Sequence, residues 1–313
     1  MTGRPQRLAA LLAEVDVDLV LVSNLVNVRY MTGYTGSNGL AVVGPDTRGF
    51  VTDFRYLEQA AAEVDPGYDR RRDPGTGDRC DTVAEILPPG ELERIRTAAQ
   101  VADAALAEIL AQGLIGRTER SVADALEAAM RTRGAQRAAF DPIVAAGRRG
   151  SLPHARPEDV PIAAGQLVTI DWGAEVDGYC SDCTRTVAAG EPTSRAREVY
   201  ELVLGAQRAG VKAVRAGAGG REVDAAARRV IEAAGHGEHF GHGLGHGVGL
   251  EIHEAPRLST RSSDTLQKSS SITIEPGVYI PGELGVRIED LVVVTIDGGE
   301  ILTSTDKALL VTD

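Results

Sequence analysis

The stretch QLVTIDWGAEVDGYCSDCTRTV, residues 166–187, carries the pattern that decides the fold. Two apolar runs flank the sequence EVDG, which is typical of a tight turn between paired strands. One acid interrupts each run, Asp171 in the first and Asp182 in the second, although charged residues are rarely buried unless they are paired or bind a metal. The stretch therefore predicts a strand pair that carries two carboxylates.

The same arrangement recurs near the C-terminal end of the chain. The segments SITIEPGVYI (271–280) and GVRIEDLVVVT (285–295) form a second predicted strand pair, interrupted by Glu275 and Glu289. If the two strand pairs pack face to face, their four carboxylates converge on one pocket.

Two segments with helical periodicity precede each strand pair. In the first round they are residues 91–111 and 118–134, with Thr118 as the N-cap and Gly134 as the stop; in the second they are 194–217 and 221–235, with Ser194 as the N-cap and Gly235 as the stop. Two helices and then a strand pair, twice over, predict two similar halves. We expect an α+β fold in which helices cover one face of a largely antiparallel sheet.

The first ninety residues follow a different pattern. A helical segment around residues 8–12 gives way to three short runs typical of strands, DLVLVS (18–23), GLAVVG (39–44) and GFVTD (49–53). Residues 65–80 are rich in Pro, Gly and charge and indicate a loop or linker, and LPPGE at 87–91 is a second breaker. We therefore expect an N-terminal domain at 1–88 and a second domain at 89–313.

Composition excludes several classes of function. The net charge of −12, from 45 acidic and 33 basic residues, argues against a nucleic-acid partner. No apolar run approaches the roughly 20 residues of a membrane span, and the first 20 residues indicate a helix leading into a strand rather than a signal peptide. Three cysteines, an odd number, give no disulfide framework, so we expect a reducing cytoplasm.

A histidine-rich loop, HFGHGLGHGVGLEIHE at 239–254, lies before the second strand pair and holds four of the six histidines. Taken singly, an acid in a strand or a histidine is more often a solvent-facing or hydrogen-bonded residue. Four clustered carboxylates, however, repel one another and require protons or cations, and oxygen ligands with an imidazole suit divalent metals. Two metals about 3.5–4 Å apart bridge a hydroxide and polarise a carbonyl, so the pattern predicts hydrolytic chemistry.

The motifs resemble a known family. IDWGAEVDGYCSDCTRT, HGLGHGVGLEIHE, TIEPGVYIPGELGVRIED and GSLPHARPED resemble the pita-bread metallopeptidases, within them the Xaa-Pro dipeptidase (prolidase) and aminopeptidase P branch. NVRYMTGYTGSNG and FVTDFRYLEQA resemble the creatinase-like N-terminal domain of that branch. The resemblance implies a creatinase-like N-terminal α/β domain, shortened between Tyr68 and Leu92, and a pseudo-symmetric pita-bread catalytic domain with a curved, largely antiparallel sheet covered by helices.

The resemblance also implies five metal ligands. Asp171 matches the bidentate ligand of one metal, and Asp182 and Glu289 match the carboxylates that bridge both metals. His246 and Glu275 match the ligands of the other metal, and Glu275 also matches the residue that exchanges a proton with the bridging water.

Four further residues match positions around the substrate. His154 matches a histidine beside the substrate, His242 one that lines the pocket, and His253 one that hydrogen-bonds the scissile carbonyl or the intermediate. Arg287 matches an arginine behind the ligands, where its charge orients and balances nearby carboxylates.

The implied activity is hydrolysis of the Xaa-Pro bond of dipeptides or short peptides by a metal-bridging hydroxide. The nitrogen of that bond belongs to a tertiary amide without an N–H, which a metal site need not hold. Oxygen-rich ligation favours manganese, with cobalt, iron or zinc as alternatives. The resemblance further implies a homodimer.

Other readings remain open. Aminopeptidase P, which acts on longer peptides, is the main alternative within the family, and a non-catalytic pita-bread module that binds peptides is a more distant one. CSDC at 180–183 is weak evidence for redox chemistry, and the glycine-rich loop lacks a phosphate-binding motif. His236 and His239 match no catalytic position, and we expect them on the surface or at a helix terminus.

Overall fold

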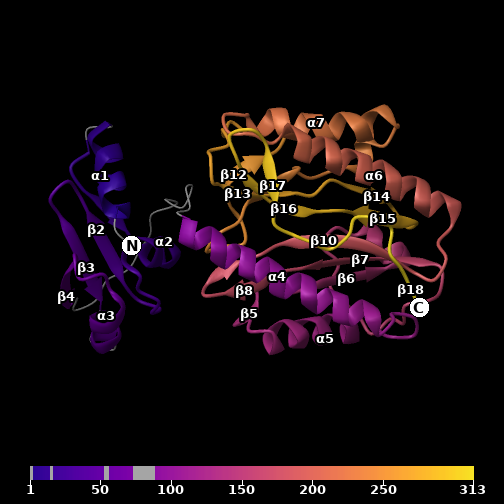
Figure 1. Cartoon of the computed structure of the whole chain (residues 1–313), viewed down its shortest axis with the longest axis horizontal. Coiled ribbons are helices and arrows are strands. Elements are labelled where there is room, and N and C mark those ends of the chain that lie inside the picture. The colour runs from indigo at the N-terminus through magenta and orange to yellow at the C-terminus, as the bar shows by residue number, and fades with distance from the viewer. Residues whose placement is uncertain (1–2, 15–16, 53–55, 73–88) are drawn as a thin grey trace. The chain divides into compact units, whose positions relative to one another are not determined.

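The computed structural model describes residues 3–14, 17–52, 56–72 and 89–313 (Figure 1). Contacts between residues divide the chain into two units, Met1–Ala84 and Glu85–Asp313. The domain boundary expected between residues 88 and 89 falls at the end of a segment, 73–88, that lies outside the described residues. Among the described residues, no helix has both the length and the apolar character needed to cross a lipid bilayer.

The first unit is a four-stranded sheet with three helices. Its elements are α1 (Arg4–Glu14), β1 (Val20–Val22), α2 (Leu25–Thr32), β2 (Leu40–Val43), β3 (Arg48–Thr52), α3 (Leu57–Glu63) and β4 (Asp69–Arg72). The strand order is β1-β2-β3-β4, antiparallel except for the parallel pair β3–β4. Apolar side chains such as Val28, Met31 and Phe50 are fully buried in it.

One expectation for this unit was wrong. Residues 69–72, within the segment expected to be a loop, form β4 along the edge of the sheet. The sequence of β4 is DRRR, which has no alternation of apolar and polar residues. Because its pairing with β3 uses only backbone groups, the side chains gave no signal of a strand.

The second unit contains the two predicted rounds. The first comprises α4 (Pro89–Ala111), α5 (Glu119–Thr132), β5 (Arg137–Ala138), β6 (Ile143–Ala146), the 3₁₀ helix η2 (Gly147–Ser151), β7 (Gln166–Trp172), β8 (Ala174–Val176), β9 (Tyr179–Cys180) and β10 (Cys183–Ala189). The second comprises α6 (Ser194–Ala213), α7 (Gly220–Ala233), the 3₁₀ helix η3 (Gly237–His239), β11 (Gly245–Gly247), β12 (Glu254–Leu258), β13 (Ser271–Ile274), β14 (Gly277–Ile280), β15 (Leu284–Arg287), β16 (Asp290–Val294), β17 (Gly299–Ile301) and β18 (Val311–Thr312).

The two rounds form separate sheets, except that β18 of the second round pairs with β10 of the first. Strands β18-β10-β7-β6 make one sheet, and β12-β11-β13-β16-β17 make another. The pairs are antiparallel except for β10–β18. Figure 1 shows α4 and α5 on one side of these strands and α6 and α7 on the other. The expected α+β fold, with helices outside a largely antiparallel sheet, is confirmed.

Each helix pair buries its own apolar core against its own strands. Leu106 of α4 and Leu126 of α5 pack in one cluster with Val168 and Val187. Val203 of α6 and Ile231 of α7 pack in a second cluster with strands of the C-terminal half, including Ile274 and Val292. Because the helices cover the outer faces, the facing strands of the two halves remain free to form a site.

Local signals set most of the boundaries. Thr118 caps α5 in a capping box with Ser121, and Gly134 follows the helix with φ 102°, as expected. Thr193, not the expected Ser194, caps α6 by accepting a hydrogen bond from the amide of Ala196. Both residues have a suitable hydroxyl, and because Thr193 is the cap, Ser194 is the first residue of the helix.

The hairpin turn is confirmed, but the long strands are broken. Asp177 (φ 49°) and Gly178 (φ 78°) are both left-handed in the tight turn between β8 and β9. The segments expected as continuous strands at 271–280 and 285–295 each divide in two. Glu275 and Glu289 lie in these breaks, where their side chains leave the strand ladder.

Candidate metal centre

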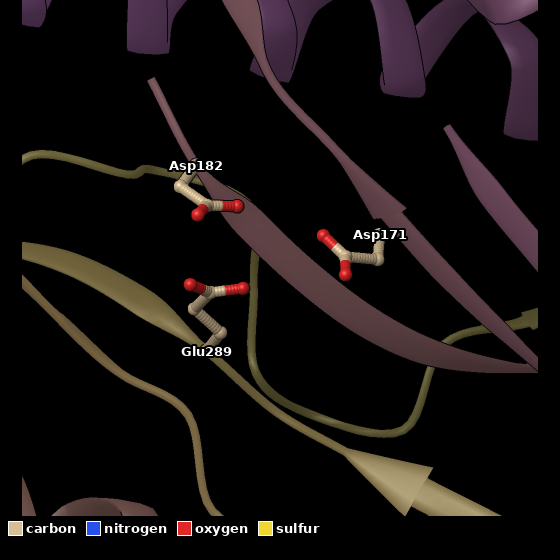
Figure 2. A group of neighbouring side chains, drawn as sticks. All are labelled: Asp171, Asp182 and Glu289. Atoms are coloured by element: carbon tan, nitrogen blue, oxygen red, sulfur yellow. The ribbon is translucent and has the colours of Figure 1, made fainter. Parts of the chain in front are cut away.

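Three carboxylates from distant parts of the sequence meet between the two halves. Asp171 lies on β7, Asp182 lies just before β10, and Glu289 lies between β15 and β16. One oxygen atom of each lies within 4.8 Å of the others. Figure 2 shows the three side chains pointing toward one another.

Strand register brings the three residues together. Asp171 is paired with Thr184 across β7 and β10, so Asp182 lies close by at the start of the neighbouring strand. Thr184 also links the halves: its carbonyl accepts the amide of Glu289 at 3.0 Å and its hydroxyl donates to Glu289 Oε2 at 2.7 Å. Thr184 thus fixes Glu289 of one half against β10 of the other.

Some oxygens of these carboxylates have no hydrogen-bond partner among the described residues. Asp171 Oδ1 and Glu289 Oε1 are buried, and neither accepts a hydrogen bond from the described residues. Burial, together with the charges of Glu289 and Asp171, raises the pKa of Asp182 well above its ordinary value. Burial and the charges of Glu275 and Asp171 do the same to the pKa of Glu289. Orphaned, mutually repelling oxygens of this kind fit a divalent cation between them.

His246 and Glu275 complete the cluster from the second half. His246 Nε2 lies 3.3 Å from Glu275 Oε1 and 3.7 Å from Asp182 Oδ2. The other ring nitrogen, Nδ1, lies 3.0 Å from the carbonyl oxygen of Gly247, which only accepts, so Nδ1 carries a proton. A neutral His246 therefore directs the lone pair of Nε2 at the acids, which is the orientation of a metal-binding imidazole.

Neighbouring groups keep Glu275 in its charged form. Burial raises the pKa of Glu275, but its hydrogen bond with His246 and the charge of Arg287 outweigh that effect and lower the pKa to about 2. Thr273 adds a hydrogen bond from its hydroxyl to Glu275 Oε1 at 3.0 Å. Glu275 is therefore held as a carboxylate beside His246 Nε2.

The glycines beside His246 have a steric cause. A Cβ atom on Gly245 would lie 2.0 Å from the carbonyl oxygen of Thr273, and one on Gly247 would lie 2.0 Å from that of Ala255. Strand β11 runs between β12 and β13, so both contacts come from neighbouring backbones. The alternating glycines of the histidine-rich loop therefore let the backbone that carries His246 pack closely.

Arg287 supports the cluster through hydrogen bonds. It is 3% exposed, and its Nη2 donates to Asp171 Oδ2 at 2.6 Å. Its Nε donates to the hydroxyl of Thr184 at 3.0 Å, and its Nη1 donates to the carbonyl of Pro153 and to Tyr279 Oη. Burial raises the pKa of Asp171 above its ordinary value although the charge of Arg287 opposes this, and the hydrogen bond from Arg287 orients one oxygen of Asp171.

A cavity of about 400 Å³ opens onto the cluster. Its walls include the three histidines predicted around the substrate, with apolar and cationic neighbours: His154, His242, His253, Phe140, Ile252 and Arg257. The ring of His253 stands edge-on to that of His246, with centroids 4.4 Å apart, and burial and His246 lower the pKa of His253. His154 and His253 are exposed, whereas His242 is partly buried.

The structure brings together all nine residues predicted for the site, since each of them lines this cavity. His236 and His239 lie elsewhere, at η3, with their Nδ1 atoms 2.9 Å apart. Cys180 and Cys183 are buried free thiols, and burial raises the pKa of Cys180 to about 12. Redox use of the CSDC sequence requires an accessible thiolate, which this environment opposes.

Sequence reasoning missed several residues that support the site. Thr184 and Tyr279 contact Arg287 by hydrogen bonds, and the sequence pattern predicts both only as strand residues. Glu254, 6% exposed, accepts the amide of Glu251 at 2.8 Å and so ties down the loop that carries His253. The sequence signal for Glu254 is its position directly after His253, a predicted pocket histidine.

Comparisons with known protein families agree with this geometry. The profile described as "Metallopeptidase family M24" matches residues 93–296. The profile described as "Creatinase/Prolidase N-terminal domain" matches residues 4–133.

Individual relatives match over nearly the whole chain. An Xaa-Pro dipeptidase of Pyrococcus furiosus is 36% identical, over 99% of this chain and 100% of that protein. The "Uncharacterized peptidase YqhT" of Bacillus subtilis is 41% identical, over 98% of this chain and 99% of that protein.

Solved structures are similar over the same extent. An Xaa-Pro dipeptidase from Bacillus anthracis superimposes with a TM-score of 0.93 at 38% identity, covering 98% of this chain and 99% of that one. An X-Pro aminopeptidase from Thermotoga maritima superimposes with a TM-score of 0.87 at 34% identity, covering 99% of this chain and 100% of that one.

Proposed function

Because the chain belongs to metallopeptidase family M24, we propose that it is a metal-dependent Xaa-Pro dipeptidase. The observation that carries this proposal is the meeting of Asp171, Asp182 and Glu289 with two orphaned oxygens at the edge of a cavity. Membership of the family implies divalent metal ions as cofactors. The donor set at the cavity fits such ions, because it combines acidic oxygens with one imidazole nitrogen.

Five residues are proposed as ligands of two ions. Asp171, Asp182, His246, Glu275 and Glu289 would hold these ions through their carboxylate oxygens and one imidazole nitrogen. Metal ions held there supply Lewis acidity toward the scissile carbonyl and lower the pKa of a bound water. The four carboxylates favour manganese, with cobalt, iron or zinc as alternatives.

The protein's own groups then orient the substrate and move the protons. Glu275 accepts a proton from the attacking water and passes it to the leaving nitrogen. The exposed imidazole of His253 is turned toward the cavity and donates a hydrogen bond to the oxygen that becomes negative in the transition state. His154 contacts the substrate from another part of the cavity wall. Arg287 holds Asp171 in place through a hydrogen bond.

A dipeptide is the proposed substrate. Relatives named Xaa-Pro dipeptidase align over almost the full length of the chain, and a cavity of about 400 Å³ suits a small ligand. The second candidate is an Xaa-Pro aminopeptidase that accepts longer peptides, favoured by the similar structure with that name from Thermotoga maritima.

Two further proposals come from the sequence and the family resemblance. We propose that the protein acts in the cytoplasm, and the free thiols of Cys180 and Cys183 fit a reducing compartment. We also propose that it is a homodimer.

A metal-replacement assay tests the function. The purified protein is stripped with a chelator, reloaded with Mn²⁺, and assayed with Ala-Pro, Leu-Pro and a longer Xaa-Pro peptide. Cleavage of the dipeptides alone supports the dipeptidase, and cleavage of the longer peptide supports the aminopeptidase. If no metal-dependent cleavage of either occurs, the protein is a non-catalytic peptide-binding module instead.

A further inference from the structure

A chain of three hydrogen bonds runs from Arg287 to the pocket wall. Arg287 Nη1 lies 2.9 Å from Tyr279 Oη, and Tyr279 Oη lies 2.9 Å from His242 Nε2. His242 Nδ1 lies 2.7 Å from the carbonyl oxygen of Gly243. Two groups in this chain have only one possible role, because a guanidinium only donates and a carbonyl only accepts.

These fixed ends determine every proton between them. Since the Gly243 carbonyl accepts, His242 Nδ1 carries the proton. A neutral ring then has a lone pair on Nε2, which accepts the hydroxyl proton of Tyr279, and the tyrosine oxygen accepts from Arg287 in turn. In this arrangement every donor in the series of three hydrogen bonds has an acceptor.

We infer that His242 is held as the neutral Nδ1–H tautomer by Gly243 and Tyr279, so that it offers no proton to the substrate, and that Tyr279 is a positioning residue. The inference deepens, and in its kinetic consequences rests on, the proposed function. It assigns His242 a different role from His154 and His253, although all three line the same cavity.

Protonation of the His242 ring would disrupt this series of hydrogen bonds. An imidazolium donates from both nitrogens, which would leave the hydroxyl of Tyr279 facing two donors, although Tyr279 is only 7% exposed. Burial and the charge of Arg287 also lower the pKa of His242, although the charge of Glu275 opposes them. Geometry and charge therefore favour the same neutral form.

The surroundings fix the ring in this position. The ring of Phe240 stands edge-on to that of His242 at 5.1 Å. Arg228, paired with Asp224, donates to the backbone carbonyls of Phe240 and His242 at 2.9 and 2.7 Å. The backbone that carries His242 is thus anchored to α7, and turning the ring would lose its contacts with Phe240, Gly243 and Tyr279.

The two other pocket histidines differ in this respect. Within the described part of the chain, the rings of His154 and His253 make no side-chain hydrogen bond, and both are exposed to the cavity. Their nitrogens remain available to a substrate. Proton donation to the peptide is therefore assigned to these two residues, whereas His242 provides a rigid, uncharged wall.

Nitrogen-15 NMR tests the tautomer directly. The protein is labelled with ¹⁵N-histidine and loaded with Zn²⁺, which is diamagnetic, and long-range ¹H–¹⁵N correlations are recorded near neutral pH. The signals of His242 are identified by their loss in His242→Gln. The inference predicts a protonated Nδ1 and an unprotonated, hydrogen-bonded Nε2; a proton on Nε2, in either the other tautomer or the charged ring, would overturn it.

A matched pair of tyrosine variants tests the role of Tyr279. Tyr279→Phe removes the donor to His242, whereas Tyr200→Phe removes a buried hydroxyl whose partner, the carbonyl of Lys307, lies outside the cavity. The Nε2 signal of His242 should move toward that of a nitrogen with a free lone pair in Tyr279→Phe only. Equal shifts in both variants would show a general structural effect and contradict the positioning role.

Kinetics provide a separate readout. If His242 is a wall rather than a proton donor, Tyr279→Phe should raise KM for Ala-Pro about five- to ten-fold, and the fall in kcat that follows from the lost contact with Arg287 should be the smaller effect. A main loss in kcat would instead place Tyr279 and His242 on the path of the proton. If the wild-type protein cleaves no Xaa-Pro peptide, the proposed function fails, and the NMR result alone decides the inference.

Discussion

Glu289 and Asp290 are neighbours in the sequence, both are almost completely buried, and they lie in opposite electrostatic environments. Asp290 is the first residue of β16, with its side chain among polar groups behind the site, whereas Glu289 lies in the break before that strand and lines the cavity. The pair shows how one protein handles a buried carboxylate in two different ways.

Asp290 has internal partners for both oxygens. Oδ1 accepts from Arg185 Nη2 at 2.9 Å and from the hydroxyl of Thr303 at 3.0 Å. Oδ2 accepts from Gln207 at 2.8 Å and from the ammonium of Lys307. Burial raises the pKa of Asp290, but the charges of Arg185 and Lys307 outweigh burial and lower it.

Glu289 has other acids for neighbours. Only Thr184 donates to its carboxylate among the described residues, and Oε1 accepts no hydrogen bond from them. Its raised pKa reflects burial and the charges of Glu275 and Asp171. The difference teaches that a structural carboxylate is matched by a cationic side chain, whereas the cluster at the cavity leaves that charge to an ion from outside.

The largest effect is expected from removing a proposed bridging anion. Asp182→Asn keeps the shape of the side chain but removes one negative charge from between the proposed metal positions. We expect turnover of Ala-Pro to fall by about 10³-fold or more, and bound metal, measured by inductively coupled plasma mass spectrometry, to fall as well. The circular dichroism spectrum should remain that of the wild type; full turnover in this variant would refute the bridging role.

The comparison itself is tested by making the same chemical change at both neighbours. Asp290→Asn leaves Arg185 and Lys307 without their buried counter-charge and should lower the free energy of unfolding by about 3–5 kcal/mol. Glu289→Gln relieves repulsion, so it should raise the melting temperature of the chelator-treated protein.

Chemical denaturation of both variants, with and without metal, measures these effects. Opposite signs in the metal-free protein support the distinction between the two carboxylates. Destabilisation of similar size in both would mean that Glu289 is as well compensated as Asp290.

The sequence predicts only part of the difference between Glu289 and Asp290. The acids at 171, 182, 275 and 289 stand out because they interrupt apolar strands, whereas their assignment with His246 as a ligand set rests on the family resemblance. Asp290 stands out equally in the sequence RIED, yet its partners Arg185 and Lys307 lie 105 and 17 residues away. Adjacent residues on a strand point to opposite faces, so Glu289 and Asp290 are expected on different sides, but no local signal shows which of the two faces the other acids.

Other features were hidden for similar reasons. Strand β4 pairs through its backbone alone, so its sequence DRRR indicated a loop. The hydrogen bonds of Tyr279 join it to residues 8 and 37 positions away, and nothing in the sequence EPGVYI distinguishes it from a core tyrosine. Periodicity, caps and turns are local signals, whereas these contacts depend on the tertiary fold.

The pH dependence of stability sharpens the comparison further. Asp182 and Glu289 have pKa values raised above the ordinary 3.8 and 4.5, so the folded, metal-free protein binds their protons more tightly than the unfolded chain does. Their contribution is therefore complete at low pH and is lost as the pH rises through the raised values. Glu275, with a pKa lowered to about 2, has the opposite sign, and its contribution is lost as the pH falls below 4.5.

We therefore expect the metal-free protein to be most stable in mildly acidic solution and to lose stability toward about pH 8. Because metal binding requires deprotonated ligands, added Mn²⁺ should raise the melting temperature more at about pH 8 than at about pH 5. Scanning calorimetry with chelator and with Mn²⁺ measures both trends. A metal-induced shift that is independent of pH would argue against binding by these carboxylates.

The smallest effect is expected at a third kind of buried acid. Glu254 is 6% exposed, and burial raises its pKa to about 7 with a smaller contribution from the charge of Glu251, while the backbone amides of Glu251 and Leu250 donate to its carboxylate. Glu254→Gln should lower the free energy of unfolding by about 1 kcal/mol and leave metal content unchanged. Glu251→Gln, at an exposed neighbour, serves as the control, and loss of metal in Glu254→Gln would place this acid with the ligands instead.

The most direct test of the account is anomalous diffraction from crystals grown with Mn²⁺. The account predicts two anomalous peaks per chain, about 3.5–4 Å apart, between the carboxylates of Asp171, Asp182 and Glu289 and beside His246 Nε2. Crystals in which these carboxylates enclose no anomalous peak, while the protein still cleaves Xaa-Pro peptides, would contradict it.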